Sequence, residues 1–195
     1  MSDNDNLIRR CQEGELAAFT ELFRAQEARI YRLAIVILRN EQDAEDAVQD
    51  AFIRILERIR SYRGESSFET WMTRLVVNLC RDKLRRLKVR RALSLEWLYG
   101  HASDHNLPRE VDERLERQRL WALVQQLDDK YRLPVILRYH EDLSCEEIAE
   151  VLHLRISVVY ARLNAARERL RTIARDGQMV DVGAPANELS NWQIR

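Results

Sequence analysis

Residues 43–91 read DAEDAVQDAFIRILERIRSYRGESSFETWMTRLVVNLCRDKLRRLKVRR, two helical patterns of opposite charge. The segment opens acidic, because residues 41–50 hold five Asp and Glu and no Lys or Arg. It closes basic, because seven Lys and Arg between residues 81 and 91 surround a single acid, Asp82. Two helices of opposite charge indicate one face that binds a protein and another that binds a polyanion.

The acidic part predicts an amphipathic helix. Asn40 is a candidate stop for the preceding helix, and Asp43 is a candidate cap for this one. The apolar stripe comprises Ala44, Ala47, Val48, Ala51, Phe52, Ile55, Leu56 and Ile59. The outward face comprises Asp46, Gln49, Asp50 and Glu57. Taken alone, such a face is most often just solvated.

The basic part predicts a second helix after a short polar and aromatic loop. Ser66 and Glu69 have the spacing of a capping box, and the helix then runs to about Leu87. Its predicted buried stripe is Phe68, Trp71, Leu75 and Leu79, and its polar face is Arg74, Asn78, Arg81 and Arg85. The aromatic residues of the loop admit a second interpretation, as ordinary core residues.

The composition favours a helical protein without catalytic motifs. Thirty-two basic and thirty-two acidic residues balance in 195, and Gly and Pro are scarce. Three widely spaced cysteines do not form a disulfide framework, which fits a reducing compartment. No signal peptide or membrane-length apolar run is visible, so we expect a cytoplasmic protein. We expect no cofactor and no metal site, since phosphate loops, nucleophile motifs and metal-ligand spacings are missing.

The flanking sequence divides the chain into two helical domains. Periodicity from Leu7 predicts a short helix and a long one separated by Gly14. We assign residues 7–88 to a first domain, 89–112 to a linker, 113–175 to a second domain and 176–195 to a disordered tail. The linker carries apolar residues such as Trp97 that suit docking on a surface.

The second domain ends in a helix-turn-helix pattern. Ser144 and Glu147 form a second capping box, which opens a short helix, and a longer basic helix follows a tight turn. The second helix of such a motif enters the major groove of DNA. Its base-reading candidates are Arg155, Ser157, Val158, Tyr160, Ala161, Arg162 and Asn164. A purely structural helical hairpin is the alternative.

These motifs resemble those of bacterial sigma-70 family sigma factors of the extracytoplasmic-function (ECF) group. The similar segments are DAEDAVQDAF at residues 43–52, YRGESSFETW at residues 62–71, and LSCEEIAEVL at residues 143–152. The resemblance spans about Leu7 to Arg175, interrupted by the linker. It implies an all-α fold of two small domains and a non-catalytic protein that directs RNA polymerase to promoters.

The resemblance also implies partners for each surface. The polymerase contacts would be Asp46, Gln49, Asp50, Ile53 and Glu57. The promoter −10 element would be held by Tyr62, Arg63, Ser66, Arg74, Asn78, Arg81, Lys83, Arg85 and Arg86. The −35 element would be read by the seven base-reading candidates together with Arg167. The linker would thread toward the RNA exit path, and an anti-sigma factor is an expected partner.

The turn and recognition helix depart from the family pattern. Members usually carry Gly at the position of His153, a Gly-Thr pair at Ser157-Val158, and Lys at Tyr160. His153 would need a left-handed conformation that Gly adopts more readily. Base specificity therefore does not transfer from the family.

Two other functions remain open at this stage. A helix-turn-helix regulator that does not bind polymerase would explain residues 143–171 but not residues 43–91. Metal sensing through His140, Cys145 and His153 is the second, although these spacings match no familiar zinc pattern.

Overall fold

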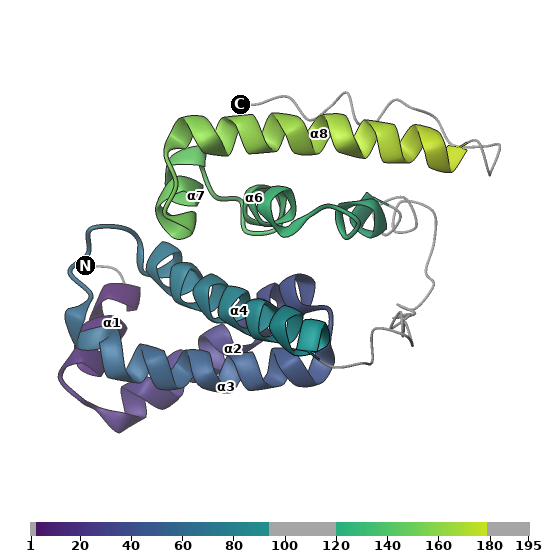
Figure 1. The fold of residues 1–195 in the computed structure, drawn as a ribbon. Coiled ribbons are helices and arrows are strands. Elements are labelled where there is room, and N and C mark those ends of the chain that lie inside the picture. Colours follow the sequence, from purple (N-terminus) through teal and green to yellow (C-terminus); the bar gives the residue numbers. More distant parts are fainter. Residues whose placement is uncertain (1–2, 94–119, 179–195) are drawn as a thin grey trace, which may run out of the picture.

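The computed structural model describes residues 3–93 and 120–178, and every regular element within those ranges is a helix (Figure 1). An N-terminal group contains α1 (Asp3–Gln12), α2 (Leu16–Leu38), α3 (Glu41–Arg58), the 3-10 turn η1 (Ile59–Ser61) and α4 (Phe68–Leu93). A C-terminal group contains the helical residues 120–124, α6 (Asp129–Tyr139), α7 (Cys145–Leu152) and α8 (Ile156–Gln178). The predicted all-α class is confirmed. None of the described helices combines the length and apolar character that a membrane crossing requires.

The N-terminal group follows the predicted element order with one shifted cap. Gly14 separates α1 from α2 at a φ of 91°, which a side chain would strain. Arg39 ends α2 in the left-handed conformation, and Asn40 then caps α3 by accepting a hydrogen bond from the Asp43 backbone N–H at 2.9 Å. The predicted cap, Asp43, is therefore three residues too far along the chain, whereas the predicted stop, Asn40, is one residue past the end of α2 at Arg39. Leu56, predicted to be buried, is exposed at the edge of the α3 stripe.

Helix α4 begins one residue later than the predicted capping box implies. The Ser67 hydroxyl, not that of Ser66, accepts from the Thr70 backbone N–H at 3.0 Å. The helix continues to Leu93 instead of ending near Leu87, and so extends into the predicted linker. Its predicted buried stripe from Phe68 to Leu79 is confirmed. The rest of the predicted linker, including Trp97, and most of the predicted tail lie outside the described residues.

A second stripe of α4 is buried as well. Thr70, Thr73 and Val77 recur at steps of three and four and are at most 2% exposed. They lie beside the first stripe, so α4 is covered on two sides. Helices α2 and α3 pack against α4 from within the N-terminal group, and α7 packs against it from the C-terminal group (Figure 1).

The C-terminal group contains the predicted helix-turn-helix. The capping box is present, since the Ser144 hydroxyl accepts from the Glu147 backbone N–H at 3.1 Å and the Glu147 carboxylate accepts from the Ser144 backbone N–H at 2.9 Å. Pro134 lies inside α6, beyond the first turn. A separate small core holds this group together; its members are Val124, Leu127, Val135, Ala166 and Leu170.

The two groups share one continuous buried core. Buried residues of α2 and α4 form a single cluster with Leu133, Ile136 and Leu137 of α6 and with Ile148 of α7. Polar contacts between the groups also satisfy the end of α2. The Gln125 amide donates to the Val36 carbonyl at 3.2 Å, and the buried Arg132 guanidinium donates to the Ile37 carbonyl at 3.4 Å. These bonds supply partners for carbonyls that a helix C-terminus leaves free.

The capping box predicts a measurable stability effect. Ser144→Ala should lower the free energy of unfolding by about 1 kcal/mol, because the Glu147 N–H loses its acceptor. Chemical denaturation followed by circular dichroism measures the loss. Ser157→Ala, the same replacement at an exposed position early in α8, is the matched control and should change stability little. Equal losses in both variants would contradict the cap assignment.

Candidate nucleic-acid interface

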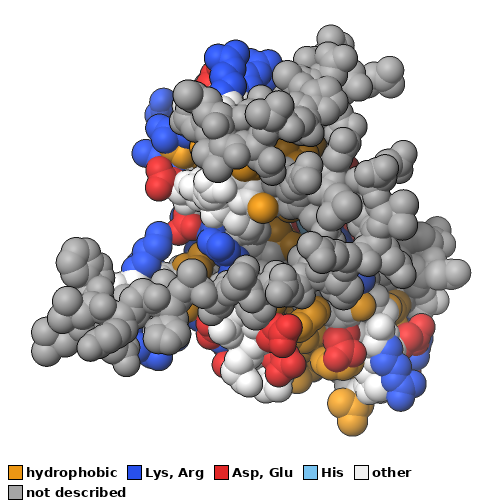
Figure 2. All heavy atoms as spheres, turned by 90° about the vertical axis from the view of Figure 1, so that its right-hand side faces the viewer, with side chains coloured by type: hydrophobic (Ala, Val, Ile, Leu, Met, Phe, Trp, Pro, Cys, Tyr) orange, Lys and Arg blue, Asp and Glu red, His pale blue; other side chains and the backbone are white. Residues whose placement is uncertain are grey.

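Helix α3 presents a mixed acidic and apolar surface. The five residues predicted to contact polymerase all lie on its exposed side, and Ile53 is 56% exposed. Figure 2 shows acidic and hydrophobic side chains next to one another on the lower half of the molecule, which the N-terminal group forms. An exposed apolar residue surrounded by carboxylates suits a protein partner better than a nucleic acid.

Lys83 belongs to this acidic surface instead of standing free for DNA. Its ammonium lies 3.1 Å from the Asp43 carboxylate and 3.0 Å from the Asp46 carboxylate. Partial burial disfavours the ammonium charge, but the hydrogen bonds to Asp46 and Asp43 outweigh it and raise the pKa of Lys83. The same hydrogen bond lowers the pKa of the Asp46 carboxyl. Lys83 thus ties α4 to α3.

The loop before α4 is held by aromatic packing and backbone contacts. The rings of Tyr62, Phe68 and Trp71 lie 5.5 Å apart, centroid to centroid, in each pair. The Tyr62 hydroxyl donates to the Ser66 carbonyl at 2.8 Å. Gln12 of α1 donates to the Ile59 and Tyr62 carbonyls, which fastens the loop to the first helix. Tyr62 therefore packs in the cluster and remains partly accessible, while Arg63 is exposed.

The basic residues of α4 divide into exposed and engaged ones. Arg81, Arg85 and Arg86 are exposed, and Arg85 lies 3.2 Å from Asp82 on the same helix. Asn78 is half-buried. The Arg74 guanidinium lies 3.0 Å from the Glu150 carboxylate of α7. The structure therefore leaves a basic strip near the middle of α4 exposed to solvent, whereas Arg74 near the beginning of α4 is paired with α7.

The recognition helix α8 follows α7 after a tight turn. His153 ends α7 in the left-handed conformation, at a φ of 54° and a ψ of 51°, as the sequence predicted. Arg155, Ser157, Tyr160, Ala161 and Asn164 are exposed, and the remaining predicted base-reading residues, Val158, Arg162 and Arg167, are half-buried. The first turns of α8 are therefore accessible, as insertion into a major groove requires. Figure 2 shows Lys and Arg side chains at the top of the molecule, where Figure 1 places α8.

The left-handed turn residue gives a second stability prediction. His153→Gly should raise the free energy of unfolding by up to about 1 kcal/mol, because Gly adopts a positive φ without the Cβ clash. His153→Ala, which removes the imidazole but keeps the Cβ, is the control and should not stabilise the protein. Thermal unfolding of both variants measures the difference, and a gain in both would point to the imidazole instead of the backbone.

The cysteines and histidines do not form a metal site in the described part of the chain. Cys11, Cys80 and Cys145 are free and buried. Burial raises the pKa of the Cys80 thiol to about 12, so this thiol stays protonated and unreactive at neutral pH. No cluster of three or more His, Cys, Asp or Glu side chains suited to a metal ion occurs among the described residues.

Comparison with known proteins identifies the two helical groups. The Sigma-70 region 2 family matches residues 22–90, and the Sigma-70, region 4 family matches residues 117–170. The chain is 32% identical over 178 residues to the ECF RNA polymerase sigma factor SigW of Bacillus subtilis (strain 168), covering 87% of this chain and 95% of that protein. This chain is a member of the ECF sigma factors of the sigma-70 family.

Other sigma factors are similar to a comparable extent. The ECF RNA polymerase sigma factor SigM of Mycobacterium tuberculosis (strain ATCC 35801 / TMC 107 / Erdman) is 31% identical, with 86% of this chain and 82% of that protein covered. Among solved structures, the sigma factor RpoE of Bartonella quintana, in complex with the anti-sigma factor NepR, has a TM-score of 0.67 at 19% identity. That match covers 80% of this sigma factor and 96% of the other chain, and it supports the fold.

The sequence did not reveal the contacts between region 2 and region 4 of this sigma factor. Thr70 and Arg74 of α4 meet Glu147 and Glu150 of α7, which lie more than seventy residues away in the chain. The repeat of Thr70, Thr73 and Val77 was the available signal, because it marks a second stripe on a helix that already had one.

Proposed function

We propose that this sigma factor binds core RNA polymerase and directs it to promoters, which it opens for transcription initiation. The observation that carries the proposal is the presence in one chain of a region 2 with an acidic, partly apolar helix and of a region 4 with an accessible recognition helix. A protein with these two regions can join polymerase to DNA at two separate points. In this proposal the sigma factor itself catalyses no reaction.

The polymerase surface in this proposal is the exposed side of α3. Gln49, Asp50 and Ile53 lie at its middle, and Glu57 continues it toward the C-terminus of the helix. Interface energy concentrates in a few residues with buried apolar area and surrounding polar contacts. Ile53 is the apolar member of this group, so it should be the centre of the interface.

Promoter DNA occupies two other surfaces in the proposal. The loop from Arg63 to Ser66 and the strip of Arg81, Arg85 and Arg86 hold the −10 element as a single strand, through stacking and phosphate contacts. The first turns of α8 read the −35 element in the major groove. Because Val158 and Tyr160 replace usual polar or basic residues, the −35 sequence should differ from that of relatives.

We also propose that an anti-sigma factor binds this protein in the cytoplasm, and that a signal controls this binding. Support comes from two proteins of similar fold. One is the Bartonella quintana sigma factor with NepR, and the other is CnrH in complex with the cytosolic domain of CnrY, at a TM-score of 0.63 and 23% identity. CnrH matches 87% of this chain and 96% of its own.

The decisive experiment is transcription by reconstituted holoenzyme across genomic DNA. Purified core polymerase with the full-length protein should start transcription at a limited set of sites, and core polymerase alone should not. Aligned upstream sequences from those sites would define both promoter elements. A protein that binds DNA but forms no complex with core polymerase would instead be a helix-turn-helix regulator, and the proposal would fail.

A further inference from the structure

We propose that helix α1 holds the −10 loop, residues 62–67, in the shape that receives an unpaired promoter base, and that Gln12 is the positioning residue. The proposal rests on the function proposed above, because that function places the −10 element against this loop. Helix α1 lies before residue 22, where the match to the region 2 family begins. It is located at the end of region 2 where α3 leads into α4 (Figure 1).

Gln12 joins α1 to the turn at which the chain leaves α3. Its side-chain amide donates to the Ile59 carbonyl at 3.0 Å and to the Tyr62 carbonyl at 2.9 Å. The 3-10 turn η1 starts at Ile59, and Tyr62 follows its last residue. A glutamine amide carries two N–H donors on one nitrogen, so this group can bind both carbonyl oxygens at once. Gln12 therefore fixes the point at which the chain enters the −10 loop.

Helix α1 is itself firmly seated, so it can support the loop. Three of its apolar residues are buried in the core that α2, α3 and α4 share: Leu7, Ile8 and Cys11. Near its start, the Asn4 amide donates to the Glu69 carboxylate at 2.8 Å, in the first turn of α4. Helix α1 thus contacts the chain on both sides of the −10 loop, through Gln12 before it and through Asn4 after it.

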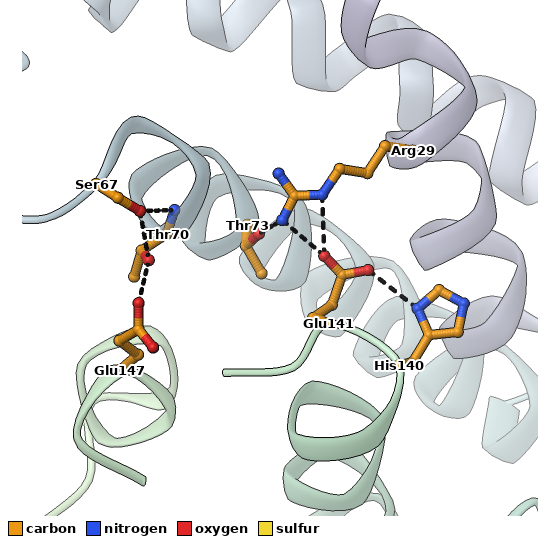
Figure 3. Close-up of polar contacts among 7 residues, drawn as sticks. All are labelled: Arg29, Ser67, Thr70, Thr73, His140, Glu141 and Glu147. Atoms are coloured by element: carbon orange, nitrogen blue, oxygen red, sulfur yellow. Dashed lines mark hydrogen bonds and ion pairs between the residues drawn. The ribbon is translucent and has the colours of Figure 1, made fainter. Parts of the chain in front are cut away.

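The far end of the −10 loop is fixed as well. The Tyr62 hydroxyl donates to the Ser66 carbonyl at 2.8 Å, which ties the two ends of the loop together. The next residue, Ser67, accepts from the Thr70 backbone N–H at 3.0 Å and so caps α4 (Figure 3). Residues 63–65 between these points are all exposed. The −10 loop is therefore a short exposed tip between two fixed ends.

Fixed ends favour the capture of a base. A base that leaves the duplex loses its stacking and pairing, so its new site must compensate for that loss. A loop that is already ordered gives up little conformational entropy when the base binds, whereas a loose loop must be ordered at that moment. Gln12 therefore strengthens binding of the extruded base without touching it.

The positioning role differs from a purely structural one in a measurable way. If Gln12 only supported the fold, its loss would lower the fraction of active protein and weaken binding to every DNA by the same factor. If Gln12 positions the −10 loop, its loss weakens the binding of one base more than the binding of the rest of the promoter. The quantity to measure is therefore the preference for DNA that carries this base.

The test compares two DNAs bound by holoenzyme that contains the full-length protein. Both are fork-junction DNAs built on a promoter mapped in the transcription experiment, with the −10 element single-stranded. One carries all its bases, and the other has an abasic site at one position. The abasic site is moved along the single strand, and the position with the largest loss of wild-type affinity is used. The ratio of the two dissociation constants then measures base capture alone.

Gln12→Met keeps the length of the side chain and removes both donors. Gln42→Met makes the same replacement at an exposed position of α3 and is the matched control. The wild-type ratio should be about tenfold or more, as expected for one stacked base. It should fall about threefold to fivefold in Gln12→Met, through loss of two hydrogen bonds, and stay unchanged in Gln42→Met.

Two other results of this comparison have different meanings. An unchanged ratio in Gln12→Met, with both DNAs bound more weakly by the same factor, would overturn the positioning role. A wild-type holoenzyme that binds the intact and abasic DNAs equally, at every position of the abasic site, would contradict the proposed function of the −10 loop itself. The wild-type measurement therefore separates failure of the proposed function from failure of this inference.

Hydrogen exchange in the free full-length protein provides a second measurement that needs no DNA. The Tyr62 backbone N–H donates to the Ile59 carbonyl at 3.1 Å, so its exchange reports the order of the turn. Gln12→Met should speed exchange several-fold in peptides that cover residues 59–70 and leave peptides from α6 unchanged. Unchanged exchange in residues 59–70, or equally faster exchange in all peptides, would contradict a local effect of Gln12 on the loop.

Discussion

Ile53→Arg is expected to weaken binding to core RNA polymerase about thirtyfold or more, a loss of about 2 kcal/mol that marks an interface hot spot. The side chain is 56% exposed, so the replacement should leave the fold intact. It removes the apolar centre of the α3 surface and buries a charge in the interface. Affinity measured with fluorescent core polymerase tests the expectation.

Leu16 provides a matched control for this substitution. It is 77% exposed at the start of α2, outside the α3 surface, so Leu16→Arg makes a similar apolar-to-charged change elsewhere. Polymerase binding should be nearly normal in Leu16→Arg. A similar loss in both variants would mean that the surface of α3 is not the specific contact, and the assignment of the polymerase face would have to move.

Arg81→Ala combined with Arg85→Ala is expected to reduce promoter opening about tenfold or more, through loss of two phosphate contacts. The slope of log affinity against log salt concentration should fall by about 1.4, at roughly 0.7 for each contact to a single strand. Core polymerase binding should stay nearly intact, because the two arginines lie on α4 and not on the exposed side of α3 that is proposed to bind polymerase. Permanganate footprinting of the melted promoter, with a polymerase binding assay in parallel, separates these effects.

The control is Arg24→Ala with Arg32→Ala, two exposed arginines of α2. This variant has the same net charge as the α4 variant, so a general electrostatic effect would appear in both. Promoter opening should be close to normal in the control. If the α4 variant loses polymerase binding and promoter opening to the same degree, the division of region 2 into two faces is wrong.

The sequence predicted the helices well because their apolar periodicity is strong. The stripes of α3 and α4 were correct at their centres and less so at the edge, where Leu56 proved exposed. Caps were misplaced where several capping residues stand close together. Asn40 competes with Asp43, and Ser67 competes with Ser66, so spacing alone did not choose between them.

Local sequence patterns could not predict the contact between region 2 and region 4. Arg29 and Glu141 are 112 residues apart in the chain, and nothing in the sequence around either residue indicates the other as its partner. Lys83 was grouped with the DNA-binding residues because it stands in a basic run, whereas its position on the helix directs it to Asp43 and Asp46. A run of basic residues gives only the average charge of a segment. The direction in which each side chain points depends on the fold.

The second stripe of α4 contains two threonines, so it is suited both to burial against protein and to exposure to solvent. Thr70 and Thr73 each combine a methyl group that packs with a hydroxyl that bonds to protein or to water. Leucine at these positions would expose apolar area whenever the neighbouring helix moved away, at about 25 cal/mol for each Å². A stripe of this composition can be exposed to solvent without promoting aggregation. The protein should therefore stay soluble whether α7 or another partner covers α4.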